Sequence, residues 1–136
     1  MSGLAERVTM HYAISFTTNM FELSDEDENP VNPIHGQSLL LWLRDKAKGT
    51  VEMDEPDTED WGWYTSIDWK GRAFLLGASA EESDDPEVYW VFQIDKQRTL
   101  KEKLLGREKM SEDDECLKYF RSLIESESGF NNIAPA

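Results

Sequence analysis

The stretch Trp61-Gly-Trp-Tyr-Thr-Ser-Ile-Asp-Trp69 carries the clearest structural signal in the sequence. Its large apolar side chains recur at every second position, which is the period of a β-strand with one buried face. Lys70-Gly71 follows at once, and a glycine at this place can take the positive φ of a tight turn. Residues 72–80 then return as a second strand. The sequence therefore predicts an antiparallel β-hairpin over 61–80.

Further strands are predicted on both sides of this hairpin. Residues 10–17 alternate between apolar and polar positions, as a half-buried strand does. Residues 88–95 are apolar on both faces, which is typical of a strand in the centre of a sheet. Residues 50–53 are predicted to form one more short strand, and the acidic continuation to residue 60 a loop.

Three helices complete the predicted elements. Residues 37–48 place leucines and a tryptophan on one broad face, and Gly49 supplies the stop. Thr99 and Glu102 have the spacing of a capping box, which predicts a short helix that ends at Gly106. A last helix begins at 111–114, where acidic residues suit the positive end of the helix dipole.

The element order β-α-β-β-β-β-α-α predicts an α+β fold. Consecutive strands joined by short turns favour a mainly antiparallel sheet of about 4–5 strands, with the helices packed on one face. With 136 residues the chain has the length of one domain. We expect that domain to cover 10–130, with 1–9 as a flexible N-terminal tail and 131–136 as a C-terminal tail.

The charge balance limits the classes of partner. The chain has 28 acidic and 14 basic residues, a formal net charge of -14. This field repels nucleic acids and anionic lipids, so we expect neither as a partner, whereas basic proteins and peptides are attracted. No apolar run is long enough for a membrane span. One cysteine and no Cys/His cluster exclude a disulfide framework and predict a cytoplasmic protein without cofactor or metal.

The acidic residues are concentrated in loops. Four segments hold 19 of the 28, namely 25–28, 52–60, 81–87 and 112–115. Two interpretations are open. The tips of several segments can come together as one anionic surface that steers a basic partner, or the segments are solvated turns that protect the sheet edges, which we slightly favour. None has the ligand spacing of a calcium loop, so no metal site is predicted.

Aromatic residues adjoin the acidic segment 52–60. Gly62, between two tryptophans, predicts a bulge or the close approach of another backbone. Indole rings exposed beside carboxylates can hold a lysine or arginine by cation–π contact. The alternative is that the indoles belong to the core, which we expect for Trp63 and Trp69 more than for Trp61. The candidate binding residues are Glu55, Asp57, Glu59, Asp60, Trp61, Trp63 and Tyr64.

The sequence offers little for catalysis. His11 and His35 stand in no catalytic motif, and helical spacing places Cys116 among core residues, where a thiol is inert. No catalytic residue is therefore predicted, and an enzyme is disfavoured. Six bases within 96–109 run against the overall charge. They form either a patch for a phosphate or an acidic protein surface, or pairs with neighbouring acids, which we favour.

These observations favour a non-catalytic acidic binding protein that engages a basic protein surface. A bacterial immunity protein or a nuclease inhibitor would have this composition, although composition alone does not define function. The alternative is a small-molecule binding protein or small enzyme with an aromatic-lined pocket between the sheet and the first helix, built from Trp42, Trp61 and Trp63. A third possibility is self-association through the edge of the hairpin.

Overall fold

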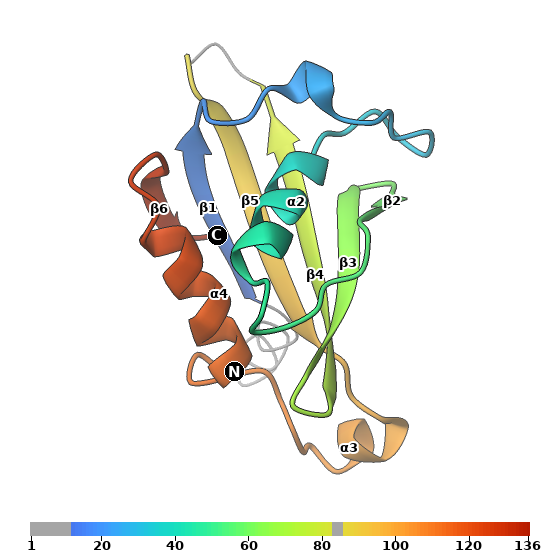
Figure 1. Ribbon diagram of the computed structural model, residues 1–136. Helices are drawn as coiled ribbons and strands as arrows, with labels where there is room; N and C mark the ends of the chain where they lie inside the picture. The colour runs from blue at the N-terminus through green and yellow to red at the C-terminus, as the bar shows by residue number, and fades with distance from the viewer. Residues whose placement is uncertain (1–11, 83–85) are drawn as a thin grey trace, which may run out of the picture.

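A six-stranded antiparallel sheet with helices on one face forms the body of the protein (Figure 1). The structure is a computed structural model that describes residues 12–82 and 86–136. The strands are β1 (Tyr12–Thr18), β2 (Asp57–Glu59), β3 (Gly62–Trp69), β4 (Arg72–Glu81), β5 (Val88–Lys96) and β6 (Asn131–Pro135). The helices are the 3-10 turn η1 (Leu23–Asp25), α2 (Gln37–Lys46), α3 (Leu100–Leu104) and α4 (Glu115–Glu125).

The predicted α+β class and the antiparallel sheet are confirmed, but the sheet is larger than expected. Its order is β2-β3-β4-β5-β1-β6, which makes six strands where the sequence predicts 4–5. β5 pairs with β4 on one side and β1 on the other, so the predicted central strand is central. The turn between β3 and β4 also forms as expected, because Lys70 and Gly71 both have positive φ, 52° and 88°.

Two strand predictions and one tail prediction need correction. The strand expected at 50–53 is reduced to a single bridge between Met53 and Ile67, and the short strand is β2, in the stretch predicted as a loop. Residues 131–136, predicted as a tail, contain β6, which pairs with the outer edge of β1. β6 is short, polar and ends in proline, so its own sequence has no strand period. The tail predicted at 1–9 lies outside the described residues.

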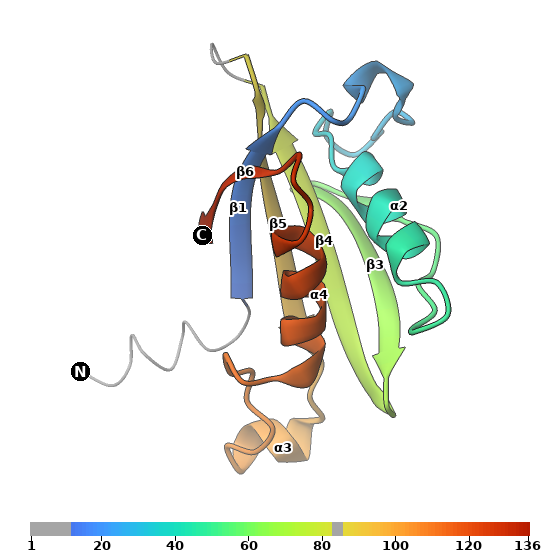
Figure 2. The same ribbon diagram turned by 60° about the vertical axis from the view of Figure 1, so that its left-hand side comes forward.

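The core lies between the sheet and the two longer helices. Figure 2 shows α2 and α4 side by side on the same face of the sheet. From β5, Trp90, Phe92 and Ile94 point to this inner face and are 0% exposed. From the helices, Leu39, Leu40, Leu43, Leu117, Phe120 and Ile124 close the core and are at most 1% exposed. The apolar positions of the alternation predicted for the strands are therefore those that face the helices.

The opposite, outer face of the sheet carries no helix in the described parts of the chain (Figure 2). Strand register aligns its residues in rows across the sheet. Gly77 of β4 lies between Tyr64 of β3 and Gln93 of β5. The next rows join Ser79 to Val91 and Glu81 to Tyr89. These residues are more polar and more exposed than those of the inner face, as expected for a sheet with one solvated side.

No helix of the described chain is both long enough and apolar enough to cross a membrane.

Candidate functional site

Trp61 lies on the outer face of the sheet, where its ring covers Gly77. A Cβ built on Gly77 would stand 2.5 Å from Cη2 of Trp61 and 2.9 Å from Cγ of Gln93. These separations are too short for any side chain, so the missing Cβ of Gly77 gives the indole its place against the strand. Trp61 is half-buried, and it lines a surface pocket. A partly exposed indole on an open sheet offers a partner a large apolar surface, as tryptophans at protein interfaces do.

A pocket opens beside this indole. Its volume is about 260 Å³, and it is lined by Ile34, Trp61, Ser79, Ala80, Glu81, Tyr89 and Val91. The register pair of Ser79 and Val91 lies between the indole and the next pair, Glu81 and Tyr89. Tyr89 is 39% exposed, so its ring is available to a ligand. Two aromatic rings and a carboxylate around a small pocket suit an organic cation such as a lysine or arginine side chain.

The buried side chain of Asn29 joins two acidic loops. Its Nδ2 donates hydrogen bonds to the carbonyl oxygens of Glu59 and Gly62, both at 3.0 Å. Its Oδ1 accepts from the backbone N–H groups of Val31 and Asn32 at 3.0 and 3.2 Å. Asn29 is 5% exposed, so its full set of bonds satisfies a buried amide. These bonds hold the loop after η1 against the β2–β3 hairpin.

A second amide strengthens the same junction. Nδ2 of Asn32 donates to the carbonyl oxygen of Asp60 at 2.8 Å. The carboxylates of Glu59 and Asp60 are left exposed, because only their backbone carbonyls take part in these bonds. Asp25, Asp27 and Glu28 on the neighbouring loop are exposed as well. Residues 25–28, at the end of η1 and after it, and residues 57–60, in β2 and its turn, therefore form one acidic rim. Trp61, the next residue after this rim, lines the outer-face pocket.

Glu26 differs from the other acids of its loop because its side chain is only 2% exposed. Its Oε2 accepts from the backbone N–H and the hydroxyl of Ser38 at 2.7 and 2.6 Å. Its Oε1 accepts from the N–H of Gly36 at 3.1 Å and lies 3.1 Å from Nδ1 of His35. The carboxylate thus caps the first turn of α2, whose own N-cap residue is a glycine. Glu26 is a structural acid and adds nothing to the rim.

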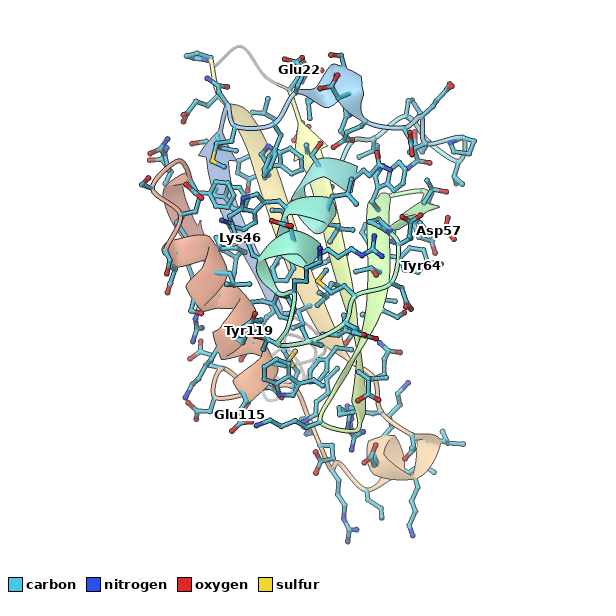
Figure 3. All side chains as sticks on the ribbon, viewed as in Figure 1. Glu22, Lys46, Asp57, Tyr64, Glu115 and Tyr119 are labelled. Carbon is cyan, nitrogen blue, oxygen red and sulfur yellow. The ribbon has the colours of Figure 1, made fainter. Side chains whose placement is uncertain are left out.

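The fourth acidic segment is separate from the rim. Figure 3 labels Asp57 of the rim beside β3, and Glu115 on the other side of the molecule at the start of α4. Glu115 pairs with Lys70 at 2.9 Å, and Lys70 holds the pKa of this carboxyl below its usual value. Asp114 caps α4 and lies 3.4 Å from Nζ of Lys96. The four acidic segments therefore do not form a single anionic surface, since 112–115 lies among bases at the far end.

The candidate residues predicted from the sequence divide between two faces and a loop. Tyr64 and Asp57 are register partners on the outer face (Figure 3), the same face as Trp61. Trp63 points the other way, is 4% exposed, and its Nε1 donates to the carbonyl oxygen of Ile34 at 3.2 Å. Trp63 therefore belongs to the core. Glu55 lies outside the strands and pairs with Arg44 at 3.3 Å.

The predicted close approach at Gly62 is present. Gly62 has φ of 147°, and a Cβ there would stand 2.5 Å from the carbonyl oxygen of Ala78. This contact lets the chain before β3 cross onto the outer face, which is how Trp61 and Trp63 come to opposite sides. Trp69 is partly buried, with its ring 5.3 Å from that of Tyr119.

Several residues of the pocket are not among those predicted. Tyr89 and Glu81 lie on strands that the sequence identifies, but their pairing depends on a register that the sequence does not reveal. Gly77 had a detectable signal, because a glycine inside a strand pattern indicates the close approach of another group. Asn29 stands in a loop that looks solvated, and nothing local marks it as buried.

The three tryptophans of the alternative pocket lie in different surroundings. The ring of Trp42 is 4.9 Å from that of Phe130, and Nζ of Lys46 lies 5.6 Å from its centroid. Trp61 covers Gly77 on the outer face, and Trp63 is in the core. The structure therefore does not bring these three indoles to one pocket between α2 and the sheet.

The described residues offer few groups for catalysis. Cys116 is fully buried at the start of α4, and burial, together with nearby Asp114, raises the pKa of its thiol. A thiol in this state is a poor nucleophile. His35 contacts Glu26 near the start of α2, at the other end of the molecule, and His11 lies outside the described residues. No cluster of three or more His, Cys, Asp or Glu suited to a metal occurs in residues 12–82 and 86–136.

Comparisons with protein-family models, with curated proteins and with solved structures give no match to this chain.

Proposed function

We propose that this chain is a non-catalytic binding protein that holds a basic segment of another protein on its outer sheet face. A lysine or arginine side chain of the partner enters the pocket between Trp61 and Tyr89. The observation that carries the proposal is the pocket itself, because it combines two accessible aromatic rings with the carboxylate of Glu81. Its volume of about 260 Å³ suits one long side chain better than a whole drug-sized ligand.

The chemistry of the pocket favours arginine over lysine. A guanidinium is planar and weakly hydrated, so it stacks on an indole while its N–H groups reach a carboxylate. A cation–π contact contributes about 0.5–1 kcal/mol at an exposed site and about 2 kcal/mol where water is excluded. Glu81 adds the opposite charge at the pocket rim. Trp61, Tyr89 and Glu81 are thus the anchoring residues of the proposed site.

The acidic rim has a different task from the pocket. Exposed carboxylates on 25–28 and 57–60 attract a basic partner at long range and orient it toward the outer face. Charges of this kind raise association rates and fix orientation more than they raise affinity. The rim therefore selects basic proteins as a class, and the pocket selects one cation on them. An immunity-like or inhibitor-like role, in which the chain covers a basic functional surface, fits this division.

Titration with a small probe tests the pocket directly. The probe is N-acetyl-arginine amide, followed by NMR of the labelled chain, with N-acetyl-norleucine amide as the uncharged comparison. We expect arginine to shift the indole N–H of Trp61 and the ring signals of Tyr89, and norleucine to leave them unchanged. The apparent affinity should fall as salt rises, because the rim and Glu81 act through charge.

Two substitutions with matched controls make the test decisive. Trp61→Leu should weaken arginine binding about tenfold, whereas Trp42→Leu removes an equally large ring on the helix side and leaves binding unchanged. Glu81→Gln should weaken it several-fold, whereas Glu112→Gln, with the same change in net charge at the far end, has little effect. The proposal would be rejected if the arginine probe changed chemical shifts across the inner face, or if the Trp61→Leu variant bound the probe as well as the parent chain does.

A further inference from the structure

α3 and its C-cap residue display three leucines to solvent. Leu100, Leu104 and Leu105 are 72%, 77% and 53% exposed, and α3 contains no buried residue. They are three of the seven exposed large apolar residues in the described chain, and they stand within six consecutive positions. Figures 1 and 2 both show α3 beyond the end of the sheet, away from α2 and α4. The leucines thus form a small apolar knob outside the core.

Polar contacts hold this knob in place. Thr99 and Glu102 form the predicted capping box, which orders the first turn of α3. Both carboxylate oxygens of Glu102 accept hydrogen bonds from Arg72 on β4, each at 2.7 Å. Arg98 donates to the carbonyl oxygen of Arg107 at 3.1 Å and closes the loop behind the helix. Since these bonds position α3, its leucines are displayed in a fixed arrangement without helping to hold it.

Unpaired cations surround the leucines. Lys101, Lys103, Arg107 and Lys109 are exposed and make no ion pair with any described residue. The sequence favours pairs between the bases of 96–109 and neighbouring acids. The structure shows such pairs for Lys96, which lies 3.2 Å from Glu108 and 3.4 Å from Asp114. A positive, apolar surface therefore stands at one end of a chain whose net charge is -14.

We propose that α3 and its flanking cations dock into an apolar groove rimmed by acidic residues on a partner protein. Leu100 and Leu104 are four positions apart, so they lie on one side of the helix, as do the anchors of helices that bind grooves. The flanking lysines and Arg107 then meet the acidic rim. This surface is distinct from the outer-face pocket and takes a partner of the opposite charge.

Charge also argues against the other occupants of such a knob. An anionic membrane would attract α3 but repel the acidic remainder of the chain. A second copy would have to bring its acidic rim to α3, and this head-to-tail contact would build rings or open filaments of many copies instead of a simple pair. A separate protein with an acid-rimmed groove meets neither difficulty.

Photo-crosslinking from α3 identifies the partner. The full chain carries benzoylphenylalanine at position 104, is irradiated in lysate of its source cells, and the attached protein is identified by mass spectrometry. The purified pair is then measured for affinity. We expect a protein whose structure has an acid-rimmed apolar groove, and about tenfold weaker binding with Leu104→Ser. Lys101→Glu together with Lys103→Glu should weaken binding similarly, and less so at high salt.

Matched variants separate docking from folding. Leu41 on α2 is also exposed, at 41%, so Leu41→Ser should leave the affinity unchanged, as should Lys48→Glu. Leu104→Ser should unfold at the same temperature as the parent chain, because Leu104 is not buried. Four outcomes would each overturn the proposal. The crosslinks could form only between copies of this chain, or no protein could be crosslinked at all. The chain could bind phosphatidylglycerol vesicles through Leu104, or the Leu104→Ser variant could bind the partner with the affinity of the parent chain. The arginine titration of the outer face is unaffected by these variants, so the two proposals fail separately.

Discussion

The indole ring of Trp61 occupies the space in which a side chain at Gly77 would stand, with Cη2 2.5 Å from the Cβ position. One wall of the outer-face pocket therefore depends on a residue that has no side chain. Gly77 is also the middle of the row from Tyr64 to Gln93, so a change there reaches three strands. This relationship makes the pocket sensitive to a single methyl group.

Gly77→Ala should displace the Trp61 ring from the sheet. We expect the free energy of unfolding to fall by about 1–3 kcal/mol, as for other overpacked sites, and acrylamide quenching of tryptophan fluorescence to increase. Chemical denaturation and quenching measure the two effects. In the Trp61→Ala background the same Gly77→Ala change should cost less, since the larger of the two clashes is gone. An equal cost in both backgrounds would show that Trp61 does not fill this space.

Asn29→Ala should destabilise the protein by about 2–3 kcal/mol, because it leaves the buried carbonyl of Gly62 and three partly buried backbone groups without this partner. Asn29→Asp should do so at least as much, since a carboxylate oxygen would then face the carbonyl oxygens of Glu59 and Gly62. Urea denaturation measures both. The control is Asn32→Ala, which removes one exposed bond to Asp60 and should cost less than about 1 kcal/mol. Similar losses for Asn29→Ala and Asn32→Ala would contradict the role given to Asn29.

Glu26→Ala should cost about 2 kcal/mol, because it removes the cap of α2 and leaves the N–H groups of Gly36 and Ser38 unpaired. Hydrogen exchange should show the loss first in the initial turn of α2. Glu28, an acid in the same loop, is exposed, so Glu28→Ala should change the unfolding free energy by less than about 0.5 kcal/mol. If the two alanine variants behaved alike, the capping role of Glu26 would be excluded.

The ion pair between Glu102 and Arg72 should make the stability of the segment around α3 depend on pH. The side-chain hydrogen bond from Arg72, followed by the bond from the backbone of Thr99, lowers the pKa of Glu102 from 4.5 to about 2. A depressed carboxyl pKa stabilises the fold above the unfolded value and loses that contribution as pH falls through the folded value. We therefore expect the backbone amides of 97–107 to lose protection from exchange as pH drops from about 4.5 to 2.

NMR titration of the Glu102 carboxyl carbon checks this assignment. Arg72→Ala should raise the pKa of Glu102 toward 4.5. Lys70→Ala should instead raise the pKa of Glu115, which Lys70 lowers, and leave that of Glu102 unchanged. A Glu102 pKa that does not respond to Arg72→Ala would show that the bidentate pair does not hold α3.

Local patterns predicted much of the fold because each is set by a few neighbouring residues. The alternation in β3 and β5 chose the buried face, and the Lys70-Gly71 pair fixed the turn of the hairpin. The capping box at Thr99 and Glu102 formed as its spacing predicts. β6 escaped prediction because its pairing with β1 joins residues as distant as Ile14 and Pro135, and its polar sequence has no period of its own.

The candidate site was less accessible to sequence reasoning. The alternation from Trp61 to Trp69 places Trp61 and Trp63 on the same face, whereas the structure places the two indoles on opposite faces of the sheet. Gly62 decides that, because its positive φ and its contact with the carbonyl of Ala78 carry the chain across the sheet edge. The grouping of acids also depended on tertiary contacts. Asn29 joins its loop to the β2–β3 hairpin, which is distant in sequence, whereas the acids of 112–115 lie at the start of α4 beside Lys70 and Lys96.

The sequence by itself determined the strand periods, the tight turn, the capping box of α3 and the excess of acids, since all of these are properties of short segments or of the total composition. The tertiary structure alone decided that Trp61 faces Tyr89 across a pocket, that Glu26 is withdrawn from the acidic rim, and that α3 stands clear of the core with its leucines outward. The physical reason is that strand register and loop docking are set by the packing of residues far apart in the chain. Such packing selects one arrangement among many that the same local patterns allow.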